Sequence, residues 1–154
     1  MSDHYEGTLD PDCVGYRTPE FDVEVEKGRL RLFSKAIGED NPIYTDEQAA
    51  RAAGFRAMPV PPTFLFCLEM ERDDPYDWFK ALNIPLAKVL HGEQAFVYHQ
   101  QACAGDVLHF SGEVAELYCK RGGSLEFLRH HNWVHLQNGE LVAEFDRTLV
   151  IRHA

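Results

Sequence analysis

The chain has few of the features that mark a membrane or secreted protein. Its longest apolar run, residues 64–68, is far shorter than the roughly 20 residues that a membrane-spanning helix needs. The first twelve residues, MSDHYEGTLDPD, are polar and acidic, which disfavours a secretory signal or a transit peptide. We therefore expect a cytoplasmic protein without membrane partners.

The sequence also lacks the cysteine pattern of a disulfide-bonded or zinc-binding domain. Its four cysteines are far apart and form no CxxC pair, so we expect free thiols. The eight histidines include the adjacent pair His130 and His131, but no HExxH sequence. We therefore expect no bound metal ion, and we place these two histidines at the surface of a strand.

Basic residues are too few for a protein that binds nucleic acid. The chain has 15 Lys and Arg against 25 Asp and Glu, a formal net charge of −10. Nucleic-acid binding needs a basic surface, so we expect no such partner. The length of 154 residues suffices to bury roughly 70% of the unfolded surface in one core. We expect one domain over residues 1–154, of which residues 1–14 form a loosely ordered N-terminal extension.

The first third of the chain predicts a strand followed by two helices. Residues 21–26 alternate apolar and acidic side chains, as in a half-buried strand. Residues 27–37 place apolar side chains three and four positions apart, which predicts an amphipathic helix ended by Gly38. Asp46 precedes the alanine-rich residues 47–53 and is expected to cap a second, short helix.

Residues 63–72, TFLFCLEMER, predict a helix that is apolar on almost every side until its last turn. Two prolines precede it, and proline suits the first turn of a helix. A short buried strand is the alternative, but the proline start and the charged end favour a helix. We place Glu69 at its solvated end. A helix this apolar must be surrounded by other elements.

The remaining chain predicts four long strands, over residues 89–100, 107–120, 125–137 and 141–152. Short turn sequences separate them, among which Asn138-Gly139 between two alternating runs is a strong hairpin signal. Strands joined by tight turns are antiparallel. One strand, a cluster of helices and four antiparallel strands indicate an α+β domain. The apolar helix would be buried most simply by a sheet that curves around it.

This order of elements resembles the hotdog fold, a curved antiparallel sheet wrapped around a central helix, here with extra overhanging helices. From about residue 15 to residue 152 the chain resembles the MaoC-like dehydratases, and in particular their N-terminal-type, FAS1-like dehydratase domain. The sequences that support this resemblance are FSKAIGEDNPIYTD, MPVPPTF, VLHGEQAFVYHQ, ACAGD and GELVAEFDRTLVIR, in that order. The resemblance implies an enzyme of acyl thioesters on coenzyme A or acyl carrier protein, with no further cofactor. Such enzymes hydrate a trans-2-enoyl group or dehydrate a (3R)-3-hydroxyacyl group.

Active members of this family carry the pattern D-x-N-P-(L/I)-H, whose Asp and His reach one water molecule. Residues 41–43 match its centre, whereas the acid position falls on Glu39 and the histidine position on Tyr44. Asp40 occupies the variable place. A phenol has an ordinary pKa near 10, so at neutral pH Tyr44 can donate a hydrogen bond but is a poor base. The catalytic candidates therefore form a degenerate pair.

Several functions are compatible with these departures. The one that the resemblance favours is the substrate-holding half of a hydratase, because N-terminal-type domains commonly carry Tyr here and pair with a catalytic hotdog. A second is a self-sufficient homodimer that uses Glu39 or Asp40 as base and Tyr44 or His91 as acid. A third is a hotdog thioesterase in which Glu69 activates water. A module that only binds acyl-coenzyme A is the remaining alternative.

The substrate-binding candidates are Asn41, Pro62, Thr63, His91, Gly92 and Gln94. Pro62 and Thr63 fix the start of the central helix, whose free N–H groups are expected to face the thioester carbonyl. Gly92 would allow a close backbone approach and Gln94 would face the thioester, although ordinary strand packing is an equal alternative. Because the family pairs two hotdogs edge to edge, we expect a homodimer or a heterodimer with a catalytic MaoC-like subunit.

Overall fold

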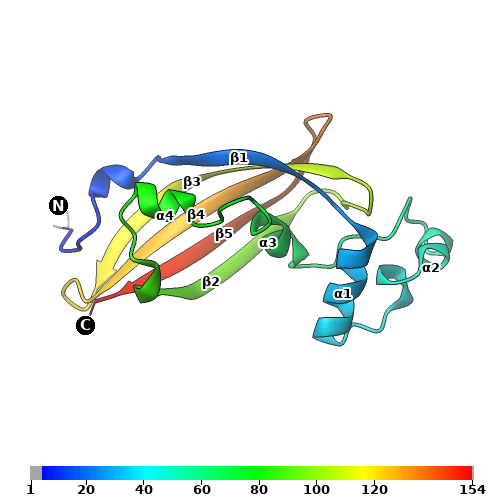
Figure 1. Ribbon diagram of the computed structural model, residues 1–154, viewed down its shortest axis with the longest axis horizontal. Helices are drawn as coiled ribbons and strands as arrows, with labels where there is room; N and C mark the ends of the chain where they lie inside the picture. Colours follow the sequence, from blue (N-terminus) through cyan, green and yellow to red (C-terminus); the bar gives the residue numbers. More distant parts are fainter. Residues whose placement is uncertain (1–4, 154) are drawn as a thin grey trace.

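The computed structural model describes residues 5–153, and its centre is one antiparallel sheet of five strands. The strands are β1 (Arg17–Glu24), β2 (Val89–Tyr98), β3 (Val107–Lys120), β4 (Leu125–Leu136) and β5 (Leu141–Arg152). Their order in the sheet is β1-β3-β4-β5-β2, so β1 and β2 are its two edges. Each neighbouring pair is antiparallel, which confirms the sheet that the sequence predicts (Figure 1).

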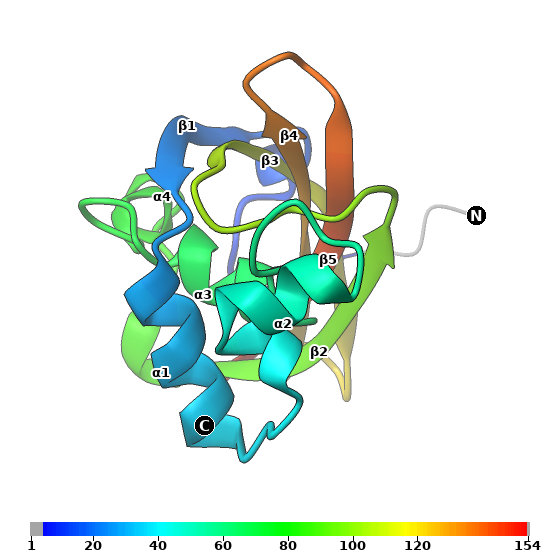
Figure 2. The same cartoon turned by 90° about the vertical axis from the view of Figure 1, so that its right-hand side faces the viewer.

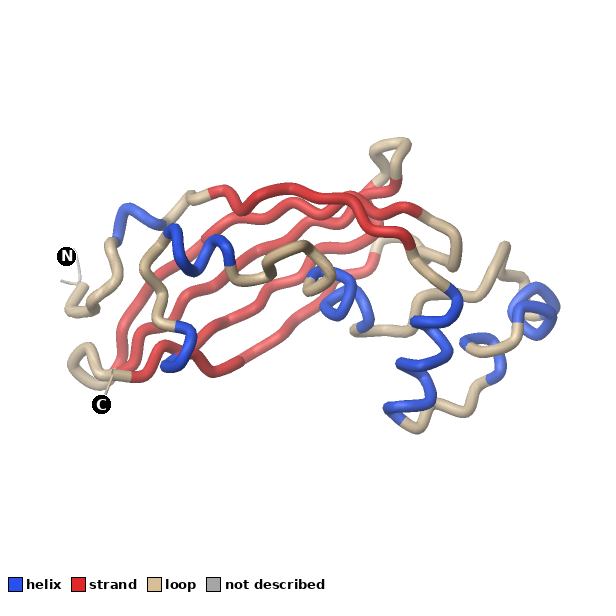
Figure 3. The backbone as a smooth tube through the Cα atoms, in the orientation of Figure 1, coloured by secondary structure: helices blue, strands red, loops and turns tan. Residues whose placement is uncertain are grey.

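Within residues 5–153, four helices and three 3-10 turns accompany the sheet. The helices are α1 (Lys27–Ile37), α2 (Glu47–Ala52), α3 (Phe64–Glu69) and α4 (Asp77–Ala81), and the turns are η1 (Pro11–Cys13), η2 (Pro42–Tyr44) and η3 (Leu86–Lys88). α1 and α2 lie beyond one end of the sheet, whereas α3 and α4 lie across one face (Figures 1 and 3). None of these helices is long and apolar enough to cross a membrane.

The sheet curves around α3, as the hotdog resemblance implies. Seen from the end that carries α1 and α2, the strands run from β1 around to β2 with α3 inside the curve (Figure 2). Phe64, Leu65 and Leu68 of α3 are at most 2% exposed and pack in one cluster with Phe110 and Phe145 of the sheet. Full burial of a side chain of this size contributes about 1.5–3 kcal/mol of hydrophobic free energy. This burial holds α3 in the centre of the domain.

α3 and β1 differ most from their predicted bounds. α3 ends at Glu69 instead of residue 72, and the chain turns before Pro75, which disfavours a helical conformation in the residue before it. β1 begins at Arg17, before the alternation of residues 21–26 starts. A register shift between Thr18 and Phe21 accommodates Pro19 in this edge strand, where proline is tolerated.

α4 lies where the sequence predicts only a loop. Its five residues are too few for a helical period to be detected, and its N-cap residue makes no side-chain cap. Trp78 and Phe79 are nevertheless buried, in a second cluster with Leu128 of β4 and Leu149 of β5. α4 therefore covers the part of the sheet that the short α3 leaves open.

The N-terminal segment packs against the sheet over residues 5–14, where a loosely ordered extension was expected. Glu126 of β4 accepts hydrogen bonds from the Tyr5 hydroxyl and from the Thr8 and Leu9 backbone N–H groups. Leu9 and Cys13 are each only 6% exposed. A buried carboxylate thus ties this segment to the strand. Residues 1–4 of the expected extension lie outside the described residues.

Candidate functional site

The degenerate motif forms a loop after α1, beyond the end of the sheet. Gly38 ends α1 in the left-handed region, with φ of 71°, a conformation that glycine adopts without strain. The Glu39 carboxylate then accepts the Asn41 backbone N–H at 2.8 Å. The Asn41 side-chain oxygen accepts the Ile43 N–H at 3.2 Å and caps η2. Both polar side chains are therefore engaged in the loop's own turns, and Asp40 is exposed.

Tyr44 lies at the end of η2 and is partly buried. Burial, and secondly the negative charge of Glu39, raise the pKa of the Tyr44 phenol above its ordinary value. The phenol is therefore neutral near pH 7 and can only donate or accept hydrogen bonds there. Tyr44 therefore cannot replace a histidine as a base near neutral pH.

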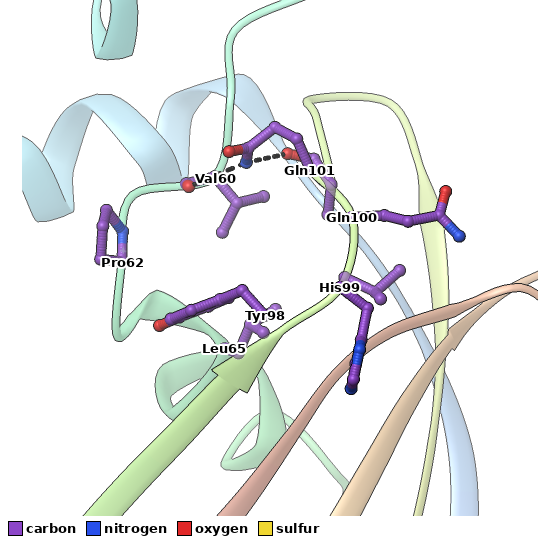
Figure 4. A pocket seen from close by; sticks show the side chains of 9 residues that line it. Val60, Pro62, Leu65, Tyr98, His99, Gln100 and Gln101 are labelled. Carbon is purple, nitrogen blue, oxygen red and sulfur yellow. Dashed lines mark hydrogen bonds between the residues drawn. The ribbon is translucent and has the colours of Figure 1, made fainter.

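The start of α3 and the end of β2 enclose a cavity of about 330 Å³. Pro62, Leu65 and Tyr98 lie around it, and Gln101 closes its rim by donating to the Val60 carbonyl at 3.2 Å (Figure 4). The volume is at the lower end of the range for small-molecule sites. Its walls are mostly aliphatic and aromatic, which suits an apolar chain.

Thr63, which follows the cavity residue Pro62, has a backbone conformation that β-branched residues seldom adopt, with φ of 72°. Its N–H donates to the hydroxyl of Tyr98 at 2.9 Å. The next N–H of the segment, that of Phe64, donates to the Pro61 carbonyl at 3.2 Å. These two N–H groups at the start of α3 thus have protein partners in this structure.

The candidates at the start of β2 contact one another and α3. His91 Nε2 lies 2.9 Å from the Gln94 side-chain oxygen, and the His91 ring stacks on Phe66 at 5.3 Å between centroids. Gly92 lies at an irregularity in the β2–β5 pairing, where an added Cβ would come within 2.7 Å of Val150. The glycine therefore permits close packing on β5. Among the described residues, no hydrogen bond or ion pair joins these candidates to Thr63 or to the degenerate motif.

A buried polar cluster beneath α3 and α4 contradicts two predictions. Glu69 is not at a solvated helix end: its side chain is 2% exposed and lies 3.3 Å from the Arg147 guanidinium. His130 is not at the strand surface but fully buried, with its ring stacked on Trp78 at 4.6 Å. Burial, and secondly the charge of Arg147, hold the pKa of His130 well below its ordinary value, so the ring is neutral.

The alternation of side chains along two strands could have identified this cluster. Phe145, Arg147 and Leu149 occupy alternate positions of β5, and all three are buried. His130 takes the same place between buried Leu128 and Asn132 of β4. Successive side chains of a strand point to opposite faces, so polar residues in an apolar alternation lie on the core side.

A second cavity, of about 180 Å³, lies beside this cluster. Its lining includes the apolar side chains of Phe66, Met70, Phe79 and Leu149 and the polar ones of Tyr76, His91 and Arg147. Leu86 of η3 and Val89 at the start of β2 form another part of the wall. This cavity brings His91 to the same space as the buried arginine, and neither Gln94 nor Gly92 lines it.

Known proteins match the chain along most of its length. The family model for the FAS1-like dehydratase domain region matches residues 12–145. A UPF0336 protein of Streptomyces avermitilis is 33% identical over 147 residues, which is 95% of this chain and 97% of that protein. The match to this relative therefore extends over nearly both full lengths.

Solved structures of complexes have the same fold. The C-terminally truncated HadBC complex of Mycobacterium tuberculosis, described as a 3R-hydroxyacyl-ACP dehydratase, has a chain 28% identical with a TM-score of 0.78, covering 90% of this chain and 97% of that one. A chain of the ChsH1–ChsH2 complex of the same organism is 23% identical with a TM-score of 0.71, covering 90% and 85%. The chain described here belongs to the FAS1-like dehydratase family and has the hotdog fold of the MaoC-like dehydratases.

Proposed function

We propose that this chain is the substrate-holding subunit of an acyl-thioester hydratase or dehydratase, and that a second hotdog subunit supplies the catalytic Asp and His. The observation that supports this most directly is the state of the degenerate pair. The Glu39 carboxylate is bound within its own loop, and the neighbouring phenol of Tyr44 has a raised pKa. Hydration needs a group that exchanges protons near neutral pH, and the phenol at the histidine position does not do so.

The two cavities along α3 are what this subunit contributes to the reaction. Removal of water from a 3-hydroxyacyl thioester takes a proton from C2 and returns one to the departing hydroxyl. The partner's Asp and His would make these transfers. This chain would hold the acyl chain against α3 and orient the thioester near Thr63, carried on coenzyme A or on acyl carrier protein.

The exposed edge of the sheet supports a partner subunit. Leu90, Val97 and Tyr98 of β2 are between 48% and 56% exposed, which is unusual for apolar side chains on one edge strand. An exposed edge strand with apolar side chains is a template for pairing with another chain. The HadBC and ChsH1–ChsH2 structures are both complexes, which agrees with such pairing.

Calorimetric titration of the purified chain with trans-2-hexenoyl-coenzyme A tests this proposal. We expect saturable binding and recovery of the thioester unchanged, because the chain holds the substrate without a proton-transferring pair. Absence of binding by both the chain and its mixture with a partner would contradict a substrate-holding role. Release of free thiol during the titration would instead indicate a thioesterase.

A further inference from the structure

Arg147 lies inside the protein with most of its hydrogen-bonding capacity unused. Its side chain is 5% exposed, and Nη1 lies 3.3 Å from Glu69 Oε2 and 3.6 Å from the Met70 sulfur. Nε and Nη2 have no hydrogen-bond partner among the residues that the structure describes. Buried donors of a charged group that lack a partner reduce the free energy of unfolding. A native protein that keeps such a group commonly uses it.

The two nitrogens without partners form one edge of the guanidinium. This edge presents two parallel N–H groups, a geometry that matches the two oxygens of a carboxylate. Protein atoms cover the edge in this structure, and the Phe66 ring centroid lies 5.6 Å from Cζ. Phe66 and Arg147 both line the second cavity, and Phe66 is only partly buried, so a movement of the Phe66 ring would expose this edge to the cavity.

The buried charges in this region do not balance. Arg72 and Arg147 have side chains that are 6% and 5% exposed, whereas Glu69 is the one buried carboxylate among the described residues that contacts Arg147. Asp77 lies 4.0 Å from Arg72 but is 40% exposed, so water screens its charge. His130 is neutral, because burial holds its pKa well below the ordinary value. Two buried cations therefore face one buried anion, which favours the entry of a second.

We infer that the second cavity is a binding site for a carboxylate on a short apolar stem, with the carboxylate on the Nε–Nη2 edge of Arg147. A volume of about 180 Å³ has room for roughly six water-sized groups, enough for a carboxylate and a few carbon atoms. Phe66, Phe79 and Leu149 would contact the stem. Two sources carry this chemistry: a free carboxylic acid, and an acyl thioester whose chain ends in a carboxylate. The second source rests on the proposed function.

Ligand titrations followed by NMR distinguish the two sources. In the first arm the chain is titrated with pentanoate and with pentanamide, which has the same shape without the charge. In the second arm, ω-carboxyacyl-coenzyme A thioesters of graded length are compared with acyl-coenzyme A thioesters that end in a methyl group. We expect the carboxylate to be preferred about tenfold or more in at least one arm, since a hydrogen bond to a charged group contributes about one such factor.

Variants link the preference to Arg147. The double change Glu69→Gln with Arg147→Met removes both members of this ion pair together, so that neither charge is left buried without the other. It should abolish the preference for the carboxylate. Arg147→Lys retains the charge but not the two-point edge, and should reduce the preference several-fold if the double variant fails to fold. Arg129→Met is the matched control, because Arg129 pairs with Glu116 and Asp146 instead, and it should leave the preference intact.

The outcomes of these titrations test the carboxylate site, and two of them separate it from the proposed function. Equal affinity for charged and neutral ligands in both arms, or a preference that survives loss of Arg147, overturns the inference. If both classes of thioester bind equally and pentanoate does not bind, the carboxylate site is refuted while the proposed function stands. If pentanoate binds through Arg147 and no thioester binds to the chain or to its mixture with a partner, the carboxylate site stands and the proposed function is refuted.

Discussion

The backbone N–H of Thr63 donates a hydrogen bond to the hydroxyl of Tyr98, with 2.9 Å between nitrogen and oxygen. The bond joins the residue before α3 to the last residue of the edge strand β2. Thr63 holds this N–H in place through a left-handed backbone conformation. A thioester oxygen that is to accept the same N–H must therefore replace the phenol.

Tyr98→Phe should strengthen the binding of acyl-coenzyme A several-fold, because it frees the Thr63 N–H for the thioester oxygen. The ring would keep its stacking on Phe96, at 5.7 Å between centroids. The free energy of unfolding should fall by about 0.5–1.5 kcal/mol through the lost hydrogen bond. Calorimetric titration with hexanoyl-coenzyme A measures the affinity. Tyr118→Phe, on β3, is the control, and weaker binding by the Tyr98 variant would contradict this role.

Thr63→Gly should raise the free energy of unfolding by about 1 kcal/mol. A β-branched residue in the left-handed region stores about 1–3 kcal/mol of strain, which glycine would relieve. The greater conformational entropy that glycine gives the unfolded chain offsets part of this stabilisation. Denaturant titration measures the change. Thr45 has a φ of −127° and provides the comparison, since glycine there should only destabilise. A loss of stability in the Thr63 variant would show that its side chain contributes more than its backbone strain costs.

Glu39→Gln and Tyr44→Phe should leave the turnover of the mixed assembly within about tenfold of the unmodified protein. Loss of a general acid or base typically lowers the rate by 10²–10⁴-fold. We expect a decrease of that size when the partner's Asp or His is changed instead. The measurement is kcat for hydration of an enoyl-coenzyme A. A drop of a hundredfold or more in either variant of this chain would support the self-sufficient enzyme.

Leu90→Lys combined with Val97→Lys should weaken assembly with the partner subunit. Both side chains are more than half exposed on β2, and charges on an edge strand oppose pairing of sheets. Size-exclusion chromatography with light scattering reports the change in mass. The matched control places lysine at Leu32 and Ile37 of α1, which are also exposed but lie away from the edge. Equal assembly by both pairs of variants would exclude β2 as the interface.

Glu126→Gln should lower the free energy of unfolding by about 1–3 kcal/mol, because Gln cannot accept all the hydrogen bonds that tie residues 5–14 to β4. Burial alone would raise the pKa of Glu126, but the hydrogen bonds from Tyr5 and its neighbours lower it to about 2. A carboxylate with a lowered pKa stabilises the fold above its ordinary pKa. The difference between the two proteins should therefore shrink as the pH falls from about 4.5 towards 2. A difference in the free energy of unfolding that stays constant over that interval would show that the negative charge of Glu126 does not strengthen these hydrogen bonds.

The sheet and α1 could be predicted because their signals are local and periodic. Strand alternation over 10 to 14 residues and the turn at Asn138-Gly139 determine β2 to β5 almost to the residue. α4 and the early start of β1 escaped prediction for lack of such a period. Their positions depend on what Trp78 packs against and on a bulge that accommodates Pro19.

The candidate site was predictable only where the motif itself identifies residues. Glu39 and Tyr44 follow from the family pattern, whereas the bond between Thr63 and Tyr98 joins residues 35 positions apart and leaves no mark in either local sequence. The contact of Glu69 with Arg147 spans 78 positions and appears only once α3 lies on β5. Burial of a charged pair depends on tertiary packing, which a one-dimensional pattern does not contain.

The rate of hydration of trans-2-hexenoyl-coenzyme A, with and without a hotdog partner that has an intact D-x-N-P-x-H motif, tests the central claim most directly. We expect a rate near the uncatalysed background for this chain alone, and a rate at least a hundredfold higher for the mixture. The mixture should also exceed the partner alone. Hydration by the purified chain alone at the rate of the mixture, abolished by Tyr44→Phe, would contradict it.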